Sequence, residues 1–289
     1  MQQTLTVTEL KPKARPWLVI FDILFYVLLA AFLLAAIYYF YSYRSIAILD
    51  VPVMLQGAAL TIFLTVMSMI LATIFGFVGA LGRISRFFLF RWIALIYVEV
   101  VRGTPILVQL FLWGYAISGA LTQIGFNPYN AAYQFMTLLQ NNSLMPDQVF
   151  FNAVFWGIIG LSFNYGAYLT EVFRTGIETI DKGQSEAGLS LGLTSTQVMR
   201  HIVLPQAIRI TVPPFANYFI TLVQDTALLS TLGGVIELQE VTTSLASPLS
   251  SAPFTELFVY ILGAVIFLAI CYPLALLARY LEGRFAVAY

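Results

Sequence analysis

Six long apolar stretches constrain the fold of this chain more than any other feature of its sequence. They cover about residues 17–40, 55–81, 92–117, 149–168, 210–231 and 257–277. A helix needs about 20 apolar residues to cross a bilayer core of about 30 Å, so each stretch is long enough to span a membrane. The stretches are continuous and do not alternate with period two, which argues against strands. The sequence therefore predicts an all-α polytopic membrane protein with six transmembrane helices.

Composition agrees with a membrane chain and excludes several other classes. The 289 residues are 60% hydrophobic and 10% charged, whereas soluble domains carry about a quarter charged residues. The formal net charge of zero gives no reason to expect a nucleic-acid partner. The only cysteine, Cys271, cannot form an internal disulfide, and the only histidine, His201, does not make a metal site by itself. We therefore expect no metal and no cofactor.

Lys and Arg residues predict the orientation of the six stretches. Twelve of the 14 basic residues fall on one side of the predicted membrane: Lys11, Lys13, Arg15, Arg83, Arg86, Arg91, Arg174, Lys182, Arg200, Arg209, Arg279 and Arg284. Arg44 falls on the other side, and Arg102 lies within a stretch. Because basic loops stay cytoplasmic, both termini are expected inside. The first stretch is longer than a signal-peptide core and lacks a following cleavage pattern, so we expect it to be retained.

Residues 173–209 form a cytoplasmic loop with a distinctive internal pattern. It contains the motif residues Glu186, Ala187, Gly188, Gly192, Ile202, Leu204 and Pro205. Gln184 or Ser185 is expected to cap a helix that begins near Glu186, and the acid is favoured near the positive end of that helix. Gly192 is expected to end this helix in a left-handed turn. An ordinary connecting loop is the alternative, but loops of this length are uncommon unless they have a function.

A second short helix is expected in the same loop. Thr194 or Ser195 can cap it, Val198 and Ile202 give it an apolar face, and Leu204-Pro205 ends it. Two short helices at an angle make a compact knob, which can sit in a groove of a partner protein and transmit motion.

The loop motif resembles the segment by which permease subunits of ATP-binding-cassette importers dock onto their ATPases; Gly188 replaces the Ala that is usual there. Three further segments are similar to the polar amino-acid uptake family of these permeases: Glu99-Val-Val-Arg102-Gly103-Thr104-Pro105, Gly166-Ala167-Tyr168 with Glu171 and Arg174, and Pro205-Gln206-Ala207-Ile208-Arg209 with Asp225-Thr226-Ala227-Leu228. The resemblance covers about residues 55–284. Gln224 departs from a Lys that is frequent in the family, which weakens any transfer of substrate identity.

The resemblance implies a type I importer fold with a five-helix core and one additional N-terminal helix. It divides the chain into a cytoplasmic segment 1–16, the additional helix and external loop 17–54, the permease domain 55–284 and a cytoplasmic tail 285–289. It also implies a bacterial plasma membrane location and four kinds of partner: two ATPase subunits, a second permease copy or paralogue, an extracytoplasmic solute-binding protein and an amino-acid substrate. The chain has no Gly-Lys followed by Ser or Thr, so ATP is expected to bind to other subunits.

Charged residues inside the predicted spans are candidates for the solute pathway, because charges in a bilayer are usually functional. These candidates are Glu99, Arg102, Thr104 and Asp225. Arg102 suits a substrate carboxylate, and Glu99 or Asp225 suits an ammonium group. The alternative is that Glu99 and Arg102 only neutralise each other.

Three functions compete as explanations of these features. An ATP-driven uptake permease explains the knob, whereas an ion-coupled secondary carrier, with Glu99 or Asp225 as its proton site, does not need one. A membrane enzyme is disfavoured because no cluster of His, Cys or paired carboxylates lies at a membrane face. Glu171, Arg174 and Glu178 have helical spacing and are expected to form an ion-pair ladder. The external segment 118–147 is expected either to receive a binding protein or to act as a lid.

Overall fold

The computed structural model describes residues 16–125, 130, 134 and 148–286. Within these ranges the chain is helical and contains no strand, which confirms the all-α prediction. The elements are α1 (Pro16–Ser42), α2 (Arg44–Ile84), α3 (Phe88–Arg102), α4 (Ile106–Phe111), η1 (Leu112–Ile117), α5 (Ser118–Gln123), α7 (Gln148–Glu178), α8 (Lys182–Ser190), α9 (Ser195–Val198), η2 (Met199–Val203), α10 (Leu204–Asp225), η3 (Thr226–Leu232), α11 (Leu238–Ala246), η4 (Ser247–Leu249) and α12 (Pro253–Ala286).

The chain divides into two units, Met1–Leu49 and Asp50–Tyr289. In the first unit, α1 is a long helix whose described side chains are mostly exposed, as expected for a helix that faces lipid. In the second unit, α7 packs against α3, α4 and α10, and α12 packs against α10 and α11. Its buried core includes Leu64 of α2, Leu110 of α4, Leu161 of α7 and Leu222 of α10.

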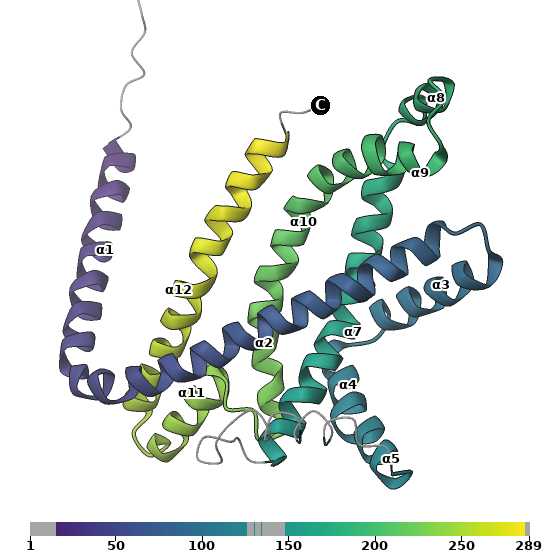
Figure 1. Ribbon diagram of the computed structural model, residues 1–289. Helices are drawn as coiled ribbons and strands as arrows, with labels where there is room; N and C mark the ends of the chain where they lie inside the picture. The colour runs from purple at the N-terminus through teal and green to yellow at the C-terminus, as the bar shows by residue number, and fades with distance from the viewer. Residues whose placement is uncertain (1–15, 126–129, 131–133, 135–147, 287–289) are drawn as a thin grey trace, which may run out of the picture. The chain divides into compact units, whose positions relative to one another are not determined.

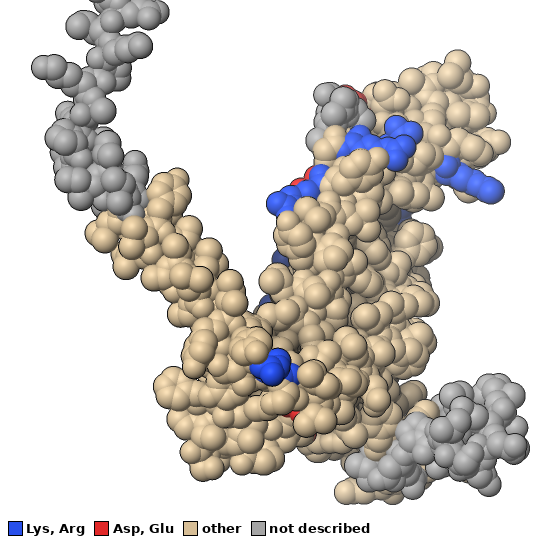
Figure 2. Space-filling model, turned by 90° about the vertical axis from the view of Figure 1, so that its left-hand side faces the viewer, with Lys and Arg blue, Asp and Glu red and all other residues tan. Residues whose placement is uncertain are grey.

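The short helices of the second unit lie at opposite ends of its long ones (Figure 1). α8 and α9 lie together at one end of α7 and α10, and α5 and α11 lie at the other end. Most of the Lys and Arg side chains on the face shown in Figure 2 lie toward the end with α8 and α9, and the surface below is mainly neutral. This distribution agrees with the charge asymmetry of the sequence.

Four helices in the described ranges are long and apolar enough to cross a membrane: Leu24–Ser42, Arg44–Ile84, Ile106–Gln123 and Pro253–Phe285. The expected third span, 92–117, is two helices, because the chain breaks after Arg102 and resumes at Ile106. Parts of the expected segments 1–16 and 285–289 lie outside the described residues. Most of the expected external segment 118–147 also lies outside them.

The helix in the region of the expected fifth span, 210–231, differs from that range at both ends. The α-helix begins earlier, at Leu204, and changes to a 3₁₀-helix at Thr226. Hydroxyl groups explain the change, since Thr226, Ser230 and Thr231 each donate to the carbonyl three residues before them, at 2.7, 2.7 and 2.6 Å. Such side-chain bonds compete with the regular α-helical pattern.

Candidate solute cavity and coupling loop

A break between α3 and α4 places Arg102 at a helix end. Pro105 has no backbone N–H and disfavours helical backbone in the residue before it, which explains the break. The amide nitrogen of Gln109 bridges the gap, donating to the carbonyl oxygens of Val101 at 2.6 Å and Thr104 at 3.1 Å. The hydroxyl and the backbone N–H of Thr104 also donate to Val101, at 3.3 and 3.5 Å, so several hydrogen bonds meet at the carbonyls of the break. Gln109 thereby holds the break that positions Arg102.

A cavity of about 470 Å³ opens beside this break. It is formed by the α3–α4 junction, by one face of α7 and by the C-terminal half of α10. Its lining comprises Arg102, Gly103, Thr104, Pro105, Ile106, Asn164, Tyr165, Tyr168, Tyr218, Thr221 and Asp225. The structure thus brings together three of the four residues predicted for the solute pathway: Arg102, Thr104 and Asp225.

The two charged groups of the cavity come from different helices and have different partners. The guanidinium carbon of Arg102 lies 5.3 Å from the ring centroid of Tyr168, within the range of a cation–π contact. The hydroxyl of Tyr165 donates to a carboxylate oxygen of Asp225 at 2.6 Å. Arg102 is exposed and Asp225 is half-buried. One cation and one anion therefore line the same cavity without forming an ion pair with each other.

Glu99 does not line the cavity. Its side chain is exposed on α3, and it forms no ion pair with Arg102 among the described residues. The alternative, in which these two residues neutralise each other, therefore has no support from their contacts. Of the two carboxylates predicted to answer an ammonium group, the structure places only Asp225 in the cavity.

Sequence reasoning missed the polar face of α7. Tyr165 and Tyr168 both line the cavity, and their rings approach Tyr218 of α10 with centroids 6.3 and 5.6 Å away. The amide of Asn164, also in the lining, donates to Gln109 at 3.2 Å. The available signal was the run Asn164-Tyr165 followed by Tyr168 within an otherwise apolar stretch. Polar groups at helical spacing in a span mark a face turned away from lipid.

The first helix of the predicted coupling loop begins earlier than expected. α8 starts at Lys182, and its cap is Asp181, whose carboxylate accepts from the backbone N–H of Gly183 at 2.6 Å. The prediction of Gln184 or Ser185 as cap was wrong. Glu186 consequently lies in the middle of α8, so the argument that placed its charge at the positive helix end does not apply.

The end of α8 follows the prediction. Gly192 has a φ of +83°, the left-handed conformation that a glycine adopts without strain. The N–H of Gly192 donates to Leu189 at 3.0 Å, and that of Leu193 donates to Gly188 at 3.2 Å. This pair of bonds is a Schellman motif, which caps the last carbonyls of a helix.

The second helix begins as expected and ends differently. Thr194 caps α9, and its side chain forms a reciprocal capping box with Gln197. The expectation that Leu204-Pro205 ends this helix was wrong, because the chain continues through the π-helical turn η2 directly into α10. Pro205 stands in the first turn of α10, where a missing N–H is tolerated.

Gly188 is the point of contact between the two halves of the knob. It is buried, and a methyl group added there would lie 2.7 Å from Cδ1 of Ile202 and 3.0 Å from Cγ2 of Val198. The smaller residue at the position where the motif usually has Ala thus lets α8 lie close against η2. Leu189 and Leu191, by contrast, are 48% and 83% exposed. A knob with a packed interior and exposed leucine side chains on its surface is suited to docking on another protein.

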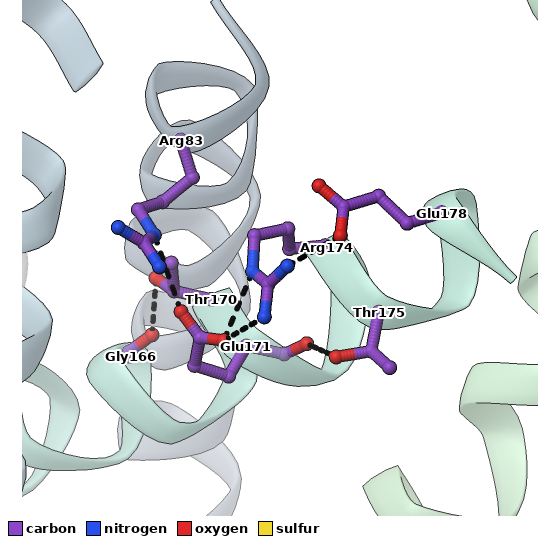
Figure 3. A network of polar contacts seen from close by, with 7 residues as sticks. All are labelled: Arg83, Gly166, Thr170, Glu171, Arg174, Thr175 and Glu178. Carbon is purple, nitrogen blue, oxygen red and sulfur yellow. Dashed lines mark hydrogen bonds and ion pairs between the residues drawn. The ribbon is translucent and has the colours of Figure 1, made fainter.

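An ion-pair ladder lies on the stretch of α7 that leads to this loop (Figure 3). Arg174 pairs with Glu171 at 2.6 Å and also with Glu178, so the predicted ladder is confirmed. The structure adds Arg83 at the end of α2, whose Nε lies 3.3 Å from Glu171. The ladder therefore ties α2 to α7.

Comparisons with known proteins agree with this architecture. Residues 72–287 match the family described as the binding-protein-dependent transport system inner membrane component. The chain is 34% identical over 242 residues to a probable amino-acid ABC transporter permease, YckA, of Bacillus subtilis, covering 84% of this chain and 93% of that protein. It is 28% identical over 237 residues to the glutamine transport system permease GlnP of Escherichia coli, covering 82% and 94%.

Two solved structures share the fold. A crystal structure of an amino acid ABC transporter with histidines matches with a TM-score of 0.64 and 29% identity, covering 82% of this chain and 96% of that one. An inward-facing structure of the MetNI methionine ABC transporter matches with a TM-score of 0.57 at 17% identity, covering 79% and 96%. This chain therefore belongs to the family of inner membrane components of binding-protein-dependent transport systems.

Proposed function

We propose that this chain is the permease subunit of an ATP-driven, binding-protein-dependent amino-acid uptake system. The observation that carries the proposal is the cavity in which Arg102 and Asp225 lie on different helices. A zwitterionic amino acid needs a cation for its carboxylate and an anion for its ammonium group, and the cavity offers both. The similarity to amino-acid permeases supports this assignment over an ion-coupled carrier.

The proposed assembly has two permease subunits, two ATPases and an external solute-binding protein. The knob formed by 181–205 docks on the ATPase through its exposed leucines and through Glu186. ATP is bound and hydrolysed by the ATPases, so this subunit carries no catalytic residue of its own. The six expected spans place both termini and the knob in the cytoplasm, with α5 on the outer side.

Arg102 variants test the solute contact. Arg102→Lys keeps the charge but loses the planar fork that binds a carboxylate through two hydrogen bonds. The loss of one charge-assisted bond is expected to lower binding-protein-dependent uptake about tenfold or more. Arg102→Leu should lower it further. Arg279→Lys, an exposed change on α12, is the matched control and should leave uptake unchanged.

A double variant separates substrate contact from charge neutralisation. If Arg102 acts only as a counterion of Glu99, removing both charges in Glu99→Gln/Arg102→Leu restores uptake. If Arg102 binds solute, the double variant stays as defective as Arg102→Leu while the yield of purified protein is unchanged. Near wild-type uptake in the double variant refutes the contact.

Single cysteines test the proposed orientation in a Cys271→Ser background. Gln123 and Ser190 are both exposed and lie in α5 and α8. A membrane-impermeant thiol reagent should label Gln123→Cys in intact cells and Ser190→Cys only after lysis. Labelling of Ser190→Cys in intact cells contradicts both the orientation and the docking role of the knob.

A further inference from the structure

A second cavity, separate from the solute cavity, lies between α2 and α3. Its volume is about 440 Å³, and its lining comes mainly from the C-terminal part of α2 and the N-terminal part of α3. Val78 and Leu81 form one side, and Ile93 and Ala94 form the other. The hydroxyl of Tyr97, which also borders it, is already used, because it donates to a backbone carbonyl of α7 at 2.7 Å. The interior is therefore suited to a hydrocarbon chain.

The cavity opens on the surface of α2 and α3 that faces away from the rest of the second unit. Val78 is 63% exposed and Ile93 is 58% exposed although both line the cavity. Apolar side chains with such exposure on two expected membrane spans face the lipid of a bilayer. A lipid chain can enter this cavity from the side without passing through the protein.

The rim of the cavity carries positive charge at one end. Ser85 and Phe90 belong to the lining, and Arg86 and Arg91 directly follow them in the sequence. Both arginines are exposed, and neither forms an ion pair among the described residues. No Asp or Glu occurs in the sequence from 84 to 98. The carboxylate that reaches this end of α2, Glu171, pairs with Arg83 and Arg174, so Arg86 and Arg91 have no ion-pair partner among the described residues.

Aromatic side chains mark the same end as a membrane–water boundary. Phe87 and Phe88 are 72% and 65% exposed, and Trp92 is 47% exposed. A Trp beside Lys or Arg is typical of the headgroup level of a bilayer, and Trp92 directly follows Arg91. The apolar cavity lies next to this boundary and suits an acyl chain. The two arginines lie at the boundary and suit the negatively charged headgroup of a phospholipid.

We propose that the α2–α3 cavity binds an anionic phospholipid, with one acyl chain in the cavity and the phosphate held by Arg86 and Arg91. Basic sites between membrane helices on the cytoplasmic side are suited to anionic headgroups. Arginine is suited to the phosphate because its fork donates two parallel hydrogen bonds. A second copy of this chain is the competing occupant, but it would have to supply anionic partners for both arginines, which the phosphate of the lipid supplies directly.

Lipid retention by the purified permease tests the proposal directly. The full chain is incubated in detergent with phosphatidylglycerol or phosphatidylcholine of identical acyl chains, and bound lipid is counted by native mass spectrometry. Wild-type protein should retain phosphatidylglycerol in preference. Each basic residue near an anionic lipid contributes about fivefold, so Arg86→Gln/Arg91→Gln should bind phosphatidylglycerol about 25-fold more weakly. Arg284→Gln, an exposed change on α12, should bind it normally.

A cavity-filling variant tests the acyl-chain part independently of charge. Val78→Trp should lose the retained lipid because the indole occupies the cavity. Ile74→Trp lies one turn away on α2, is also exposed and does not line the cavity, so it should retain lipid. Equal retention of the two lipids by the wild type overturns the proposal. The proposal is also overturned if neither Val78→Trp nor Arg86→Gln/Arg91→Gln lowers lipid retention more than its control variant does.

Crosslinking distinguishes lipid from a second permease copy. In a Cys271→Ser background, Val78→Cys should form no crosslink between two chains in native membranes. An efficient crosslink at this position shows that a second copy covers the cavity, and it overturns the lipid assignment.

Discussion

Gly188→Val should uncouple the knob from transport without preventing membrane insertion. The position is buried between α8 and η2, and a Cβ added there would lie 2.7 Å from Ile202 and 3.0 Å from Val198. The shorter contact is to the flexible end of Ile202, which can shift, and the contact to the stiffer Val198 is only slightly short, so a single methyl group can be accommodated. The two further methyl groups of Val have no such room. They have to push α8 away from η2.

The magnitude follows from two opposing effects. Gly188→Ala gains about 1 kcal/mol of helix propensity and loses a similar amount to the close contact with Ile202, so it should be nearly neutral. Gly188→Val introduces an overpacking penalty of about 1–3 kcal/mol and gains less helix propensity. A penalty of about 2 kcal/mol lowers the ratio of packed to unpacked knob by about 30-fold.

The assay is ATP hydrolysis stimulated by the loaded binding protein, together with solute uptake, in the reconstituted complex. Ser190→Val is the matched control, because it places the same side chain on an exposed position of the same helix. We expect Gly188→Val to lose stimulated hydrolysis and uptake together, and Gly188→Ala and Ser190→Val to keep both. Wild-type coupling in Gly188→Val refutes the inference that packing of the two halves transmits motion.

Three further predictions concern other contacts of the second unit. Gln109→Leu removes the bonds that bridge the helix break and should lower uptake while the yield of purified protein is kept, which uptake normalised to protein amount will show. Burial raises the pKa of Glu237, which lies between η3 and α11 outside the expected spans, to about 7 although backbone N–H groups and a Thr hydroxyl oppose the shift. Because the folded-state pKa is raised from 4.5 to about 7, the contribution of this carboxyl to stability is fully present below pH 4.5 and is lost as the pH rises to about 7. Thermal unfolding of Glu237→Gln should therefore depend less on pH between 4.5 and 7. Arg83→Gln should lower thermal stability on the order of 1 kcal/mol, because Glu171, which is only 17% exposed, loses one of its two cationic partners and keeps Arg174.

The features predicted correctly from sequence are those that neighbouring residues decide. Gly192 and Thr194 are correct because a left-handed turn and a capping box involve only adjacent residues. The break at Pro105 is equally local, but residues 92–117 were expected to form one span. The all-α class follows from continuous apolar stretches, which no tertiary contact can turn into alternating strands.

The features that were missed depend on contacts between distant segments. Asp181, Gln184 and Ser185 are all able to cap a helix, and local sequence does not choose among them; in the fold the cap is Asp181, directly after Ile180, which is buried with Val198 and Val203. Pro205 satisfies a local stop rule, yet the chain continues through a π-helical turn into α10. The cavity joins α3, α7 and α10, so its tyrosines can be assigned only when the three helices are packed together.

Uptake in proteoliposomes that contain the permease, its ATPase and its binding protein tests the central claim most directly. Labelled amino acids and the loaded binding protein are supplied on the binding-protein side, ATP is supplied on the side of the knob, and a protonophore is added to collapse any proton gradient. The account predicts uptake that requires both ATP and the binding protein and that continues with the protonophore present. Uptake that proceeds without ATP and stops when the proton gradient is collapsed would contradict it.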